Sequence, residues 1–148
     1  MSTRTLGPLG IEYDDTSAAE LAIVSRDTFK RLFETARRVS PIIRESTSDM
    51  DGEPYLSRST YRLSLDGRSG YVVRPDGELV YVFSLWTGRG DGLVKCAIRD
   101  GASHLDCFDG YLPEFYARHG FTEYRREANW TPGGPDVVFM ATPERLAR

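Results

Sequence analysis

Residues 78–101 read ELVYVFSLWTGRGDGLVKCAIRDG, and the order of residue types in this stretch decides the fold. Residues 79–83 are apolar on both faces, which is typical of a strand that is covered on each side. Glycine then occupies every second position from 88 to 92, and apolar residues recur at helical spacing from 93 to 98 before Gly101. The stretch therefore predicts a buried strand, a glycine-rich loop and a helix.

The glycine-rich loop has the properties of an anion-binding loop. Glycine lets the backbone approach a phosphate closely, and the free amides at the start of the following helix point toward it. The loop lacks the Gly-Lys-Ser/Thr of nucleoside-triphosphate loops, and its spacing is G-x-G-x-G rather than the G-x-G-x-x-G of dinucleotide-binding proteins. Taken alone, it is equally well interpreted as an anion site or as a tight turn.

The segments on either side of this stretch alternate between strand and helix patterns. Strands are predicted over 61–65, 71–73, 104–108, 121–130 and 136–140. A short helix is predicted over 112–119, and Gly120 after it favours a left-handed C-cap. Hairpins followed by strand–helix–strand–helix and a closing hairpin predict an α/β fold with a mixed sheet.

The N-terminal region carries a helical pattern. Ser17 and Glu20 have the spacing of a capping box, and apolar residues recur at roughly helical spacing from Leu21 to Ala36. We expect one broken helix or two short ones that end before Pro41. Residues 41–57 are polar and turn-rich, so a loop is expected there.

The composition indicates one ordinary globular domain. The chain has 148 residues, a formal net charge of −3 and two cysteines, Cys96 and Cys107. It has no apolar run of the ~20 residues that a membrane span needs and no apolar secretion signal at its N-terminus. The cysteines are too few for a disulfide framework and have no zinc-ligand spacing, so a reduced, cytoplasmic protein without a metal or membrane partner is expected.

Residues 79–140 resemble the GNAT superfamily of acetyl-CoA-dependent N-acetyltransferases. The family's loop motif Q/R-x-x-G-x-G/A falls on residues 87–92, where Gly90 and Gly92 match and Thr87 replaces Gln or Arg. FYARHGF at 115–121 resembles the family's F-Y-x-x-x-G-F segment. The longer stretch LDCFDGYLPEFYARHGF, followed by PDVVFM, resembles a subgroup found in bacteria and their phages.

The resemblance implies a single GNAT-like domain over 1–148, with a central mixed sheet flanked by helices on both faces and acetyl-CoA as the co-substrate. The implied cofactor-binding residues are Val82, Phe83, Ser84, Thr87, Gly88, Arg89, Gly90, Asp91, Gly92, Asp109 and Tyr116. The backbone of the 82–84 strand would hold the pantetheine arm, and Arg89 would supply the positive charge lost at Thr87. The acetyl group would pass to a primary amine by direct attack, without an acyl-enzyme.

The resemblance also implies the catalytic residues. Tyr116 would protonate the departing thiolate, because a phenol of pKa ~10 suits a thiol of pKa ~8.5; the alternative is a packing role. Glu78 and Asp106 are the candidate general bases. For Glu78 the turn beside it favours a solvated turn residue over a base, and Asp109 is as much an N-cap candidate as a ligand.

The resemblance implies a small-molecule or protein amine as the acceptor, without identifying it, and a homodimer, which is common among family members. Two other functions stay open. Thr87 favours a non-catalytic module that keeps the fold as a binding surface. An acetyltransferase for a modified nucleobase or aminoacyl-tRNA would need a basic face, for which the candidates are Arg37, Arg38, Arg44, Arg118, Arg125 and Arg126. The acidic total makes a nucleic-acid partner the weaker hypothesis.

Overall fold

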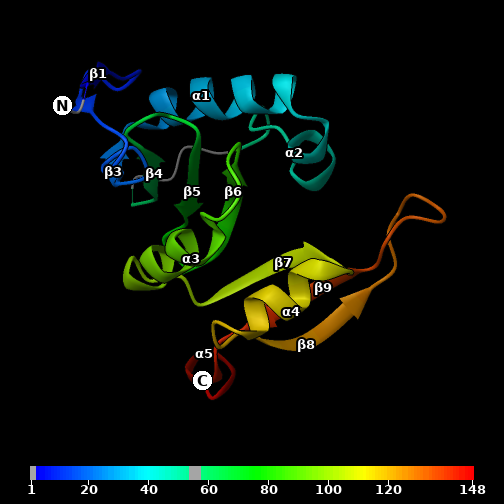
Figure 1. The fold of residues 1–148 in the computed structure, drawn as a ribbon. Helices are drawn as coiled ribbons and strands as arrows, with labels where there is room; N and C mark the ends of the chain where they lie inside the picture. The colour runs from blue at the N-terminus through cyan, green and yellow to red at the C-terminus, as the bar shows by residue number, and fades with distance from the viewer. Residues whose placement is uncertain (1–2, 54–57) are drawn as a thin grey trace.

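A computed structural model describes residues 3–53 and 58–148 (Figure 1). Its strands are β1 (Thr5–Leu6), β2 (Glu12–Tyr13), β3 (Leu21–Val24), β4 (Thr60–Ser64), β5 (Ser69–Val73), β6 (Leu79–Ser84), β7 (His104–Phe108), β8 (Thr122–Glu127) and β9 (Val137–Ala141). Its helices are α1 (Arg26–Val39), α2 (Pro41–Ser46), α3 (Gly90–Arg99), α4 (Tyr111–Ala117) and α5 (Pro143–Leu146). None of these helices combines the length and apolar character that a membrane span requires.

The strands form two main antiparallel sheets, which corrects the expected central mixed sheet. One sheet is the meander β3-β4-β5-β6, the other has the order β7-β9-β8, and β1 pairs with β2 alone. In the described residues the two main sheets join only through one parallel bridge, between Glu78 and His104. Beyond this bridge β6 and β7 do not pair, so the fold contains a parallel contact but no continuous mixed sheet.

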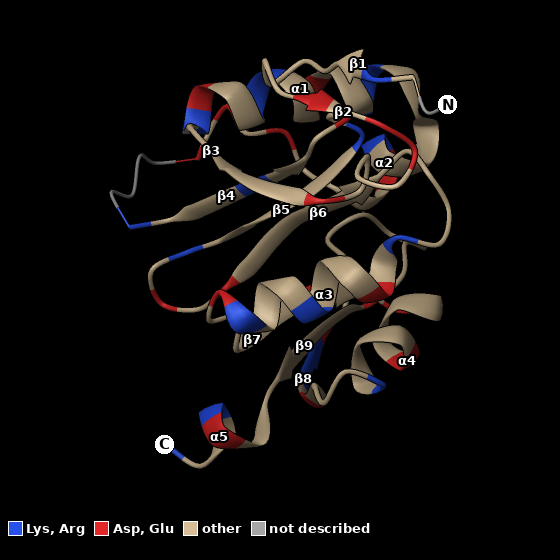
Figure 2. Cartoon of the chain, turned by 60° about the vertical axis from the view of Figure 1, so that its left-hand side comes forward, with Lys and Arg blue, Asp and Glu red and all other residues tan. Residues whose placement is uncertain are grey.

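Helices cover both faces of the four-stranded sheet (Figure 2). On one face Phe29 and Phe33 of α1 pack against Phe83 of β6. On the other face Val94 and Ala97 of α3 belong to a second core, which includes buried residues of α4, β7 and β9. Each core excludes apolar side chains from water, so β5 and β6 are stabilised from both sides.

The N-terminal region differs from the helix expected over residues 21–36. Leu21–Val24 is a strand that pairs with β4, and the helix begins only at Arg26. The Ser25 side chain accepts a hydrogen bond from the Thr28 amide and so starts the helix there. Strand pairing therefore outweighs the helical spacing of these apolar residues.

Pro41 begins a second helix, where a loop was expected. The Ser40 side chain accepts a hydrogen bond from the Ile43 amide, and proline fits the first turn of a helix because its missing donor would be unpaired there. Ile43 is buried against α1 and anchors the new helix. Residues 54–57 of the expected loop lie outside the described residues.

Candidate active site

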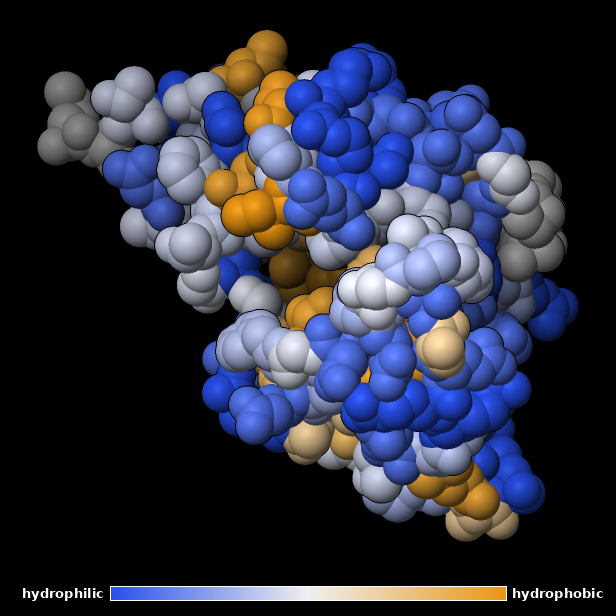
Figure 3. Space-filling model, turned by 90° about the vertical axis from the view of Figure 1, so that its right-hand side faces the viewer, coloured by the Kyte–Doolittle hydropathy of each residue, from blue (hydrophilic) through white to orange (hydrophobic). Residues whose placement is uncertain are grey.

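A cleft of about 770 Å³ opens where β6 and β7 diverge. Its walls come from the end of α2, β6, the glycine loop with the start of α3, β7 and α4, and Trp130 lies at its rim. Figure 3 shows this face of the molecule with a hollow whose floor is apolar. Segments that are up to 90 residues apart in the sequence therefore meet around one cavity.

The edge of β6 that faces the cleft is free of strand partners beyond Glu78 in the described part of the chain. Within β6, Tyr81 has a φ of +56°, and the register with β5 shifts at this point, which is a β-bulge. A positive φ is rare for tyrosine, and such strain concentrates at functional sites. Phe83 belongs to the core under α1, Val82 packs against the core under α3, and both residues also line the cleft.

The glycine loop and the start of α3 line the same cleft. Gly88 has a φ of +84°, which favours glycine, and α3 begins at Gly90 without any side-chain cap. Gly88, Gly90 and Asp91 line this cleft, whereas Arg89 and Gly92 line a second cavity on the other side of the loop. Uncapped amides at a helix start, beside a cavity, fit an anion such as a pyrophosphate.

Arg89 does not supply the positive charge that was expected from it at this loop. Its guanidinium binds the Asp66 carboxylate, with an Nη2–Oδ2 distance of 2.7 Å, and also donates to Ser69. Burial raises the pKa of Asp66, but the hydrogen bonds from Arg89 and Ser64 outweigh it and leave the pKa lowered. The arginine that lines the cleft on this side is Arg118 of α4, whose guanidinium donates to the Tyr111 hydroxyl.

Two acidic residues near the loop are held by basic partners. Asp91 in the first turn of α3 lies 2.8 Å from Nε2 of His119, which joins α3 to the end of α4. Asp109 accepts a hydrogen bond from Arg126 at 2.7 Å and does not line the cleft. The N-cap of α4 is Gly110, so Asp109 is not the N-cap that was considered from the sequence.

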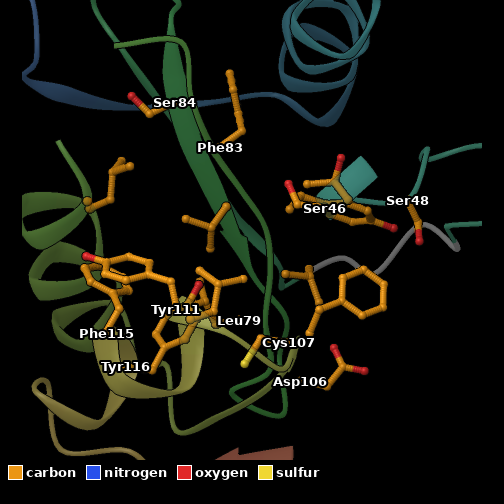
Figure 4. Close-up of a pocket in the computed structure, with 18 of the residues that line it drawn as sticks. Ser46, Ser48, Leu79, Phe83, Ser84, Asp106, Cys107, Tyr111, Phe115 and Tyr116 are labelled. Atoms are coloured by element: carbon orange, nitrogen blue, oxygen red, sulfur yellow. The ribbon is translucent and has the colours of Figure 1, made fainter. Parts of the chain in front are cut away.

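Tyr116 lies on α4 with its side chain in the cleft (Figure 4). The residue is 6% exposed, and its hydroxyl makes no hydrogen bond with any described residue. Burial raises the pKa of Tyr116, so the phenol stays protonated at neutral pH. The structure therefore offers a protonated donor with a free hydroxyl inside the cavity.

Glu78 belongs to a partly buried ion network whose members are too far apart in the sequence to be recognised from local patterns. Arg74 binds Glu78 at 2.5 Å and also binds both carboxylate oxygens of Glu53. The Tyr81 hydroxyl donates to Glu53 at 2.7 Å. Burial raises the pKa of Glu53, but these hydrogen bonds outweigh it and leave the pKa lowered. The network ties the segment after α2 to the bulge of β6.

Asp106 lines the cleft from β7 and projects away from Cys107, as the alternation of a strand predicts (Figure 4). Its pKa is raised, first because partial burial penalises the charged form and second because the Glu78 carboxylate lies nearby. Burial likewise raises the pKa of the Cys107 thiol to about 12, so this cysteine is a neutral packing residue. Asp106 is thus a carboxyl group of the cleft that lies near Glu78.

Comparison with known proteins supports the fold. The chain matches no family model and no curated protein sequence. Among solved structures it is similar to a candidate N-acetyltransferase from Lactobacillus plantarum, with a TM-score of 0.51 at 14% sequence identity. The match covers 82% of this chain and 97% of that protein. At this identity the likeness concerns the fold alone, and any activity has to be argued from the residues of the cleft.

Proposed function

We propose that this protein transfers an acetyl group from acetyl-CoA to a primary amine. The observation that carries the proposal is the meeting of three features in one cleft. These are the uncapped start of α3, the unpaired edge of β6 at its bulge, and the buried hydroxyl of Tyr116. The start of α3 would bind the pyrophosphate of an acyl-CoA, and the edge of β6 would form hydrogen bonds with its extended arm. Tyr116 would then donate a proton to the leaving thiolate.

The chain's own residues would hold the thioester as follows. The amides at Gly90 and Gly92 would bind the pyrophosphate, and the backbone of Val82–Ser84 would pair with the pantetheine arm. Unpaired amides near the bulge at Tyr81 would stabilise the negative charge that develops on the thioester oxygen. Acetyl-CoA would supply the activated acetyl group.

The proposed transfer needs one base and one acid. The amine nitrogen bonds to the carbonyl carbon while a carboxylate, Asp106 or Glu78, accepts its proton directly or through water. The carbon–sulfur bond then breaks, and Tyr116 gives its proton to the thiolate. Burial penalises both the phenolate and the thiolate, so the proton transfer between them is less uphill than the raised pKa of Tyr116 alone suggests.

Ligand binding and turnover test the proposal separately. Acetyl-CoA at 100 times its Kd should stabilise the fold by about 2.7 kcal/mol, which a thermal shift detects. Release of free thiol with a panel of amines should follow, and the intact mass of the protein should stay unchanged because no acyl-enzyme forms. Absence of any thermal shift at millimolar acetyl-CoA would refute the proposal.

A second candidate function is a non-catalytic binding module with the same fold. Two observations favour it: Thr87 stands where the family motif has Gln or Arg, and Arg89 is engaged by Asp66. Such a module would bind coenzyme A weakly or not at all and would release no thiol with any amine. Replacing Thr87 by Gln distinguishes the two, because a catalytic protein should bind acetyl-CoA more tightly in this variant.

A further inference from the structure

The cleft has two chemically different sides, separated by β6. In Figure 4, Tyr111, Phe115 and Tyr116 lie to one side of this strand, and Ser46, Ser48 and Asp106 lie to the other. Three carboxyl groups line the side near α2 and β7, namely Glu45, Glu78 and Asp106. This second side is where an acceptor would approach if acetyl-CoA occupied the side of α3 and α4.

The positive charge on this second side is paired with carboxylates of the protein itself. Arg74 is the only cationic residue that lines it among the described residues, and its guanidinium is shared between Glu78 and the buried Glu53. The side chain of Glu53 is 2% exposed, so Arg74 must neutralise it. The pKa of Asp106 is raised, first by reduced solvation of its carboxylate and second by the nearby negative charge of Glu78, and Arg74 does not outweigh these two effects.

We propose that the acceptor is a cationic alkylamine that carries no carboxylate, such as a diamine or polyamine. An ammonium group placed between Glu78 and Asp106 supplies the charge that this part of the cleft lacks. Glu45 at the end of α2 offers a third carboxylate, with which a second ammonium group can pair. The inference rests on the proposed function and narrows its substrate class.

An acceptor that carries a carboxylate would be repelled by the carboxylates on this side of the cleft. It would face three acidic side chains and, among the residues that the structure describes, no unpaired cation on this side; Arg118, the C-cap residue of α4, lies on the other side and donates to the Tyr111 hydroxyl. Like charges placed together in a partly buried cleft oppose binding. Free amino acids are therefore expected to be poor acceptors.

Trp130 provides a second contact suited to such an amine. Its side chain lines the cleft from the loop between β8 and β9, yet the residue is 87% exposed and packs into neither core. An indole face attracts an ammonium group and covers the methylene chain beside it. Replacing Trp130 by Ala should raise KM for a diamine severalfold without lowering the melting temperature.

The decisive comparison uses three acceptors of matched length. Cadaverine is L-lysine without the carboxylate, and n-pentylamine has the same net charge of +1 as lysine at neutral pH but no carboxylate. We expect kcat/KM to fall in the order cadaverine, pentylamine, lysine, with at least a tenfold preference for cadaverine over lysine at low salt. The preference should shrink at high ionic strength because the charges are screened.

A variant outside the catalytic groups tests the origin of the preference. Glu45→Gln should reduce the cadaverine-to-lysine ratio two- to fivefold, whereas Asp27→Asn, an exposed residue of α1 away from the cleft, should leave it unchanged. Equal or better use of lysine by the wild-type protein would overturn the inference while leaving acetyl transfer in place. Failure to release thiol with all three amines, together with no acetyl-CoA binding, would instead refute the proposed function.

Discussion

The two sides of β6 are built in different ways. On the side of α3 and α4, the groups proposed to hold acetyl-CoA come from two short stretches, residues 87–92 and 111–118. On the side of α2, the ion network of Glu53, Arg74 and Glu78 comes from segments up to 25 residues apart, and the carboxylate of Asp106 on β7 lies near Glu78. The first side presents backbone amides and a phenol, and the second presents carboxylates.

This difference explains what each side can be used for. Backbone amides at a helix start recognise a constant group, because glycine and helix geometry alone fix their positions. Carboxylates assembled from distant segments depend on packing, so they can change from one protein to another without disturbing the fold. Under the proposed function, the side of α2 and β7 would therefore set the acceptor specificity, and the following variants distinguish the two sides.

The largest expected effect is on the side of α3 and α4. Tyr116→Phe should lower kcat by about 10²–10⁴-fold because the thiolate loses its proton donor, while affinity for acetyl-CoA stays nearly unchanged. Steady-state kinetics with a binding measurement checks both quantities. The control is Tyr124→Phe on β8, a half-exposed tyrosine outside the cleft. Equal losses of kcat and affinity in Tyr116→Phe would instead indicate a packing role.

The sequence predicted the local features of this side well. The strand, the glycine loop and the helix appear at β6, 87–92 and α3, and Gly120 has the predicted left-handed φ, +94°. These features follow from residue types within a few positions of each other. Their roles toward acetyl-CoA remain predictions.

The sequence predicted long-range arrangements poorly. The strand at Leu21–Val24 was expected as helix, because its pairing with β4 depends on residues 40 positions away. The same holds for Arg89, whose partner Asp66 lies on the turn after β4. Glu53 and Arg74 were not candidates at all, because nothing in their local sequence reveals that they meet.

The next largest effect is expected on the side of α2, at Arg74. Arg74→Met should destabilise the fold by about 3 kcal/mol, because the buried Glu53 carboxylate is left without its partner. Chemical unfolding measures the change. The double variant Arg74→Met with Glu53→Gln should recover much of the loss, since no buried charge then remains. Destabilisation by the single variant no greater than by the double one would show that Glu53 is solvated in solution.

A smaller effect is expected at the start of α3. Gly92→Pro removes one free amide in the first turn, where proline is compatible with a helix, and should weaken acetyl-CoA binding about tenfold. Gly92→Ala is the matched control: it keeps the amide, adds a Cβ with no neighbour within 4 Å, and should raise stability by about 0.5 kcal/mol. Equal affinity in the two variants would mean that this amide does not bind the ligand.

The smallest effect concerns Asp106, where function and stability should oppose each other. Because the pKa of its carboxyl is raised in the folded protein, the group contributes most to stability below its unfolded pKa, near 3.9, and that contribution is lost as the pH rises through the folded value. Asn resembles the protonated carboxyl, so Asp106→Asn should melt slightly higher than the wild type at pH 7. The difference should vanish as the pH falls toward 4. If the melting-temperature difference between Asp106→Asn and the wild type is the same at pH 7 and pH 4, ionisation of Asp106 is not its cause. If Asp106→Asn instead melts higher at pH 7 and turns over amines more slowly, the Asp106 carboxylate serves the reaction and lowers the stability of the fold.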